Sequence, residues 1–100
     1  MEFASTVVID PDHPALPGHF PGHPIVPGVV LLDLALLAIS RALALPKAPA
    51  RLTQAKFLAP VGPGAELRIT HSAAIAGNVR FDIHCGETRV ATGSFALETA

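Results

Sequence analysis

The sequence is poor in cysteine and in charge. Cys85 is the single cysteine among 100 residues, so the chain can form neither an internal disulfide nor a cysteine-based metal cage, and a reducing, cytoplasmic setting is expected. Charged residues make up 15% of the chain, with a net charge of −1, and no block of basic residues interleaved with aromatic ones occurs. Nucleic acid is therefore not an expected partner.

Targeting segments and membrane spans are also not expected. Residues 1–10 contain two acidic residues and no basic one, unlike a secretory signal peptide. The apolar run over residues 28–45 is barely long enough to cross a bilayer and contains Asp33 and Arg41, so we interpret it as a buried core helix. Because half of the residues are hydrophobic and no internal repeat is present, the sequence predicts one folded domain over residues 1–100.

The hydrophobic pattern predicts an α+β fold. The expected helix begins near Gly28 and ends at about Leu45, before Pro46. Period-two alternation predicts strands over residues 3–9, 66–75 and 79–85. Residues 51–59, which are less cleanly patterned, and residues 88–97 are expected to form two further strands. The last four are separated by turns at residues 60–64, 76–78 and 86–87, so we expect them to form an antiparallel meander with the helix on one face of the sheet.

The predicted helix is apolar on every side, which is typical of a helix that is covered on more than one face. One face can lie on the sheet. No second long helix is available for the other face, so either the sheet curls around the helix, or another subunit covers it, or both.

A stiff loop precedes the helix. Residues 11–27 hold six of the ten prolines, and we expect an ordered, functional loop rather than a disordered one. His19 lies in this loop and is a candidate general base or acid; the alternative is a histidine that bonds the backbone. A metal site built from His13, His19 and His23 is not expected, because prolines separate them and no cysteine or acid pair completes the set.

Asp33 is the candidate carboxyl. Its neighbours at helical spacing are apolar, and no basic side chain lies within one turn of it. Because burial favours the neutral form of a carboxyl, we expect an Asp33 that is partly protonated near pH 7 and can donate a proton. The alternative is an aspartate that bonds backbone or loop groups within the fold. His71, His84 and Cys85 are interpreted as structural.

Gly28 opens the helix, where N–H groups are unpaired and the helix dipole is positive. A glycine at this place lets a carbonyl oxygen approach the backbone closely, which favours an oxyanion-binding role. The alternative is an ordinary helix cap.

Two motifs resemble the 3-hydroxyacyl-[acyl-carrier-protein] dehydratases of fatty-acid synthesis. The segment from Gly18 to Val29, with the acid at Asp33, is similar to the family pattern GHFPGxPxxPGVxxxE. Residues 56–64 resemble a second landmark, KFxxPVxPGD. The short chain is similar to the dehydratases of aryl-polyene-type pathways. The acid is Asp where most members carry Glu; related dehydratase/isomerases carry Asp, so the resemblance leaves isomerase activity open.

The resemblance implies a hot-dog fold, in which a curled antiparallel sheet of about five strands wraps around one central helix and two subunits join edge to edge. It implies that His19 removes the C2 proton of a 3-hydroxyacyl thioester and that Asp33 of the partner subunit protonates the departing hydroxyl. The Gly28 amide would hold the thioester oxygen, with Phe20, Pro27 and Val29 lining the substrate site. The implied partners are acyl carrier protein or coenzyme A as carrier of the substrate and a second copy of the chain, and no cofactor is implied.

Two other functions compete. A hot-dog thioesterase uses a helix-borne acid to direct water at the carbonyl. It does not depend on an imidazole in the loop, so the presence of His19 argues against this function. A non-catalytic acyl-binding subunit is disfavoured by the presence of both His19 and Asp33.

Overall fold

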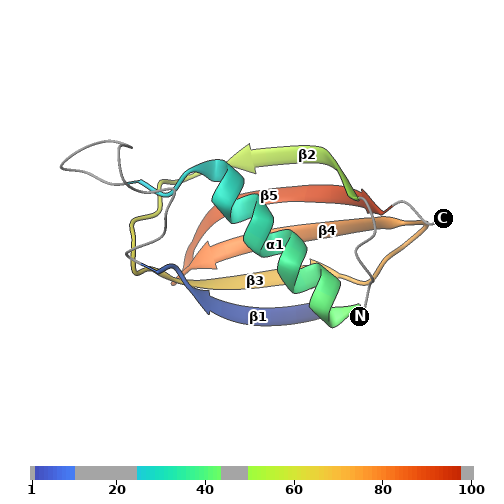
Figure 1. Ribbon diagram of the computed structural model, residues 1–100, viewed down its shortest axis with the longest axis horizontal. Coiled ribbons are helices and arrows are strands. Elements are labelled where there is room, and N and C mark those ends of the chain that lie inside the picture. Colours follow the sequence, from blue (N-terminus) through green and yellow to red (C-terminus); the bar gives the residue numbers. More distant parts are fainter. Residues whose placement is uncertain (1, 11–24, 44–49, 98–100) are drawn as a thin grey trace.

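The computed structural model describes residues 2–10, 25–43 and 50–97, which form one helix and five strands. In chain order the elements are β1 (Glu2–Val8), α1 (Gly28–Ala42), β2 (Ala50–Phe57), β3 (Glu66–Ser72), β4 (Asn78–Cys85) and β5 (Thr88–Leu97). The strands form a single antiparallel sheet in the order β1-β3-β4-β5-β2, and α1 lies across one face of it (Figure 1). The α+β prediction is confirmed.

Most element bounds agree with the prediction, and the differences lie at ends. Strand β5 has the predicted range. Helix α1 begins at Gly28 as predicted but ends at Ala42, because Leu43 leaves the helical conformation and its N–H closes the last turn on the Ile39 carbonyl at 3.0 Å. Strand β3 is shorter than predicted because Ile75 pairs with Asn78 across a tight turn.

The predicted four-strand meander is only partly correct. Strands β3, β4 and β5 are consecutive neighbours, but β2 pairs with β5 and not with β3. Strand β1 occupies the edge of β3 that β2 would need. Residues 58–65 therefore run from the edge strand β2 to β3, which lies beside the edge strand at the opposite end of the sheet. Along this crossing the Val61 carbonyl accepts the Val26 N–H at 2.8 Å, and the Gly64 N–H donates to the Ile9 carbonyl at 2.9 Å.

A β-bulge in β2 decides which side chains of this strand face the helix. Leu52 pairs with Phe95 and Gln54 pairs with Ser94, so Thr53 is the extra residue. Its hydroxyl donates to the Ser94 carbonyl at 3.1 Å. Since side chains alternate along a strand, one extra residue reverses the facing of everything that follows. As a result Phe57, at the end of β2, faces the helix side of the sheet. Lys56, the residue before it, faces the opposite side.

The core lies between α1 and the sheet. The buried face of α1 consists of Val30, Leu31, Ala35 and Ile39, and each large apolar side chain buried in this way contributes about 1.5–3 kcal/mol. Under the helix, Phe81 stacks on Phe95 with ring centroids 5.3 Å apart. Gly93 makes room for this pair, because a Cβ at that position would lie 2.8 Å from the Phe81 ring.

The outward face of α1 is uncovered in the single chain. Val29 and Leu37 are 62% and 46% exposed, and Asp33 is exposed between them. The sheet therefore covers one face of the helix, and the second cover that the sequence predicts is not provided by the described residues. Among these residues, no helix combines the length and apolar character that crossing a bilayer requires.

Candidate functional site

The N-terminal end of α1 presents free backbone donors. Pro27 is the capping residue, with φ −60° and ψ 143°, and no side chain of the described residues caps the helix. The Val30 N–H bonds the Pro27 carbonyl at 3.0 Å, whereas the N–H groups of Gly28 and Val29 have no acceptor within the described part of the chain. These two amides carry the positive end of the helix dipole and are suited to hold a carbonyl oxygen.

The ring of Phe57 lies directly over Gly28. A Cβ built on Gly28 would be 2.6 Å from the ring Cζ and 2.8 Å from Cε1, closer than real Cβ atoms come to other atoms. A side chain at this position would therefore displace the half-exposed Phe57 ring. Phe57 was not among the site residues expected from the sequence, although it belongs to the second resemblance motif.

A hollow of about 440 Å³ opens beside this contact; we call it the α1–β2 hollow. Residues 25–28, Leu31 and residues 57–61 line it, and nearly all of them are apolar. It contains the predicted Pro27 and Gly28, but not Val29, which points away and is exposed. An apolar chain can occupy this hollow with a polar oxygen at the Gly28 amide.

Asp33 does not line the α1–β2 hollow of its own chain. It lies on the outward side of α1 between the exposed Val29 and Leu37. The single chain does not supply the burial that was expected for its carboxyl. His19 and Phe20 lie outside the described residues, as do His13 and His23, so the pairing of His19 with Asp33 stays a prediction.

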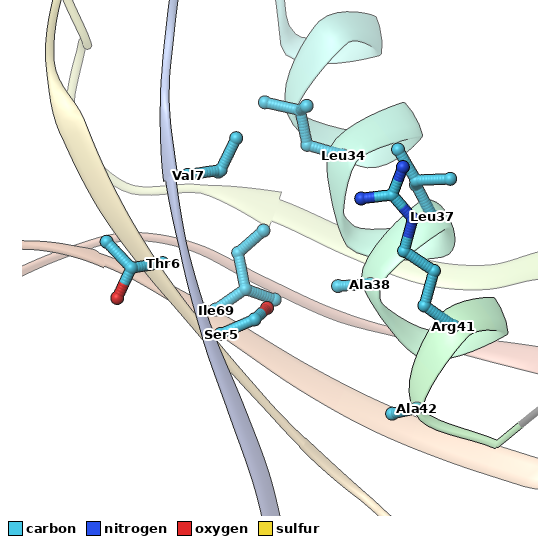
Figure 2. Close-up of a pocket in the computed structure, with 9 residues that line it drawn as sticks. All are labelled: Ser5, Thr6, Val7, Leu34, Leu37, Ala38, Arg41, Ala42 and Ile69. Atoms are coloured by element: carbon cyan, nitrogen blue, oxygen red, sulfur yellow. The ribbon is translucent and has the colours of Figure 1, made fainter.

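A second hollow, of about 350 Å³, lies on the other side of α1, between the helix and β1 (Figure 2). Leu34, Leu37 and Ala38 form its helix wall, and the Arg41 side chain extends along the helix toward Leu37. It contains none of the predicted site residues. The α1–β2 hollow is therefore the candidate substrate site.

Solved structures with this fold include enzyme components. A chain of the dehydratase heterocomplex ApeI:P from Xenorhabdus doucetiae aligns with a TM-score of 0.83 and 23% identity, over 98% of this chain and 88% of that chain. An uncharacterized protein from Erwinia carotovora subsp. atroseptica aligns with a TM-score of 0.77 and 28% identity, over 97% of this chain and 82% of that chain. The predicted hot-dog fold is confirmed.

Sequence comparisons agree with the resemblance to dehydratases. A segment of 65 residues is 35% identical to the 3-hydroxyacyl-[acyl-carrier-protein] dehydratase FabZ of Gluconacetobacter diazotrophicus. This match covers 56% of the present chain and 40% of that protein, so the chain spans well under half of its curated relative. The family model described as "ApeI-like: ApeI dehydratase" matches residues 2–94. The chain therefore belongs to the ApeI-like dehydratase family.

Proposed function

We propose that the protein removes water from 3-hydroxyacyl thioesters carried by acyl carrier protein and forms trans-2-enoyl thioesters. The observation that carries this proposal is the α1–β2 hollow, which joins an apolar cavity to the Gly28 amide, whose N–H has no acceptor among the described residues. The acyl chain would lie in the cavity, and the thioester oxygen would accept a hydrogen bond from Gly28. This bond stabilises the negative charge that develops on the oxygen when C2 loses its proton.

In the proposed reaction His19 takes the C2 proton as general base. The C3–O bond then breaks as the C2–C3 double bond forms. Asp33 of the partner subunit gives its proton to the departing hydroxyl, which leaves as water. Both side chains are assigned by the family motif, and the free amide at Gly28 supports the third role.

The second subunit is proposed because Asp33 points away from the hollow of its own chain. The stripe of Val29, Asp33 and Leu37 is exposed, and the edge strand β2 carries the exposed Leu52. An unpaired strand edge and an apolar stripe are both surfaces that association would cover. We propose a homodimer joined at β2, in which each Asp33 serves the hollow of the other chain. The ApeI:P structure from Xenorhabdus doucetiae is a heterocomplex, so a second, different chain is the alternative partner.

A thioester assay tests this function. Purified protein is incubated with a 3-hydroxyacyl thioester and, separately, with the trans-2-enoyl thioester, while enoyl absorbance and free thiol are both followed. Reversible loss and addition of water without thiol release is the expected result. Thiol release identifies a thioesterase, a shifted double bond identifies an isomerase, and no change in either signal identifies a binding subunit. The proposed place of the reaction is the cytoplasm, in keeping with the single free cysteine.

A further inference from the structure

The face of the sheet that points away from α1 carries a polar hollow. Lys56 on β2, Arg80 on β4 and Arg89 on β5 line a hollow of about 290 Å³, together with Gln54 and Thr92. These are three of the seven lysine and arginine residues of the chain. We call it the cationic hollow.

The charge of the cationic hollow is only partly balanced. Asp82 lies beside the cationic hollow, because it is the register partner of the lining residue Thr92. The Asp82 carboxylate makes an ion pair of 3.6 Å with Arg89. Neither Lys56 nor Arg80 makes an ion pair with any residue that the structure describes. Three cations that share one hollow repel one another, so an anion bound among them would be stabilised by at least two unpaired positive charges.

The cationic hollow adjoins the proposed substrate site. Leu58 lines both hollows. It follows the end of β2, where its N–H donates to the Val90 carbonyl at 2.8 Å, and Val90 follows Arg89 directly. Because β2 ends at Phe57, a long ligand can pass around the end of the strand at Leu58. Its apolar end would lie beside Gly28 and its anionic end among the cations.

We propose that the cationic hollow binds the phosphate of the pantetheine arm that carries the thioester. This inference rests on the proposed function. Acyl carrier protein and coenzyme A both attach the thioester sulfur to a pantetheine arm with a phosphate at its other end, so the recognised chemistry is the same for both. Arginine and lysine are the usual donors to phosphate oxygens, through charge-assisted hydrogen bonds.

The test compares substrates with and without the phosphate. The double variant Lys56→Gln/Arg80→Gln removes both unpaired charges and leaves an uncharged polar side chain at each position. With the acyl group on carrier protein or on coenzyme A, we expect its KM to rise about fivefold to tenfold with kcat unchanged. With the same acyl group on N-acetylcysteamine, which has no phosphate, KM should stay the same.

Arg68→Gln is the matched control, because Arg68 is exposed on the same face of the sheet but does not line the hollow. It should change none of the three KM values. Equal effects on all three substrates, or no effect of the double variant, would overturn the inference. A KM change for the carrier-protein substrate alone would also overturn it, because the cations would then contact the carrier protein rather than the phosphate.

A binding measurement separates this inference from the proposed function. Calorimetry with 4′-phosphopantetheine and with pantetheine needs no turnover. We expect the phosphate to improve affinity about tenfold at low salt in the wild-type protein and to add nothing in the double variant. Equal affinities in the wild type would refute the phosphate site even if dehydration is observed. Absence of dehydration on every thioester would refute the proposed function, whatever the calorimetry shows.

Discussion

The Phe57 ring occupies the space that a side chain on Gly28 would need, with only 2.6 Å between the ring Cζ and a Cβ at that position. This contact ties the start of α1 to the end of β2. It exists because the bulge at Thr53 turns Phe57 toward the helix. The free amide of Gly28 and the apolar wall of the hollow are thus positioned by the same packing contact.

The first prediction concerns this contact. Gly28→Ala should lower the free energy of unfolding by about 1–2 kcal/mol, since the methyl group forces the half-exposed Phe57 ring to move. In a Phe57→Ala background the same change should cost nothing or be slightly stabilising, because alanine favours helix more than glycine does. Urea denaturation of the four proteins measures the coupling. Gly62→Ala is the control, because a Cβ there meets no atom within 4 Å. Equal costs of Gly28→Ala in both backgrounds would contradict the packing explanation.

The second prediction tests whether the active site is shared between subunits. His19→Ala and Asp33→Asn should each abolish dehydration and leave the assembly folded. When the two variants are co-expressed, half of the dimers are mixed, and each mixed dimer has one site with both groups intact. About a quarter of the wild-type activity should therefore return. If the mixture stays as inactive as its components, His19 and Asp33 do not meet across a subunit boundary.

The third prediction concerns the exposed stripe on α1. Leu37→Glu should dissociate the dimer, because it places a charge where we expect the second subunit to cover an apolar side chain. Sedimentation velocity measures the oligomeric state. Ile75→Glu serves as control: Ile75 is 71% exposed, but it lies in the turn between β3 and β4. A Leu37→Glu protein that remains dimeric would remove α1 from the interface.

The fourth prediction separates a structural histidine from the catalytic candidate. His71 is 3% exposed, stacks on Phe3 with centroids 5.1 Å apart, and its Nδ1 lies 2.9 Å from the Ser72 carbonyl. His71→Ala should lower the free energy of unfolding by about 2–3 kcal/mol through lost packing and a lost hydrogen bond. Activity per folded molecule should be unchanged. His84→Ala, on the polar side of β4, should cost under about 0.5 kcal/mol in the same denaturation experiment. Loss of kcat in folded His71→Ala would disprove the structural role.

The local features of the fold could be predicted from the sequence. The start of α1 at Gly28, the range of β5 and the turn at residues 86–87 all follow from hydrophobic period and turn residues. These signals act over a few neighbouring residues, so they can be read without knowing the fold. The family motif likewise identified Gly28 and His19 as candidates. The structure places Gly28 at the start of α1, where its N–H has no acceptor among the described residues.

Only the tertiary structure decided how distant segments meet. Strand β2 pairs with β5 because β1 already occupies the edge of β3, and neither choice is encoded in the pattern of β2 itself. The single extra residue Thr53 then sets which side of β2 faces the helix. That places Phe57 over Gly28 and Lys56 on the opposite face of the sheet. The partner of a strand and the direction in which its side chains face depend on contacts between residues far apart in the chain. The hydrophobic period of the sequence therefore determined the helix and the strands, whereas the packing of these elements determined the site that they form.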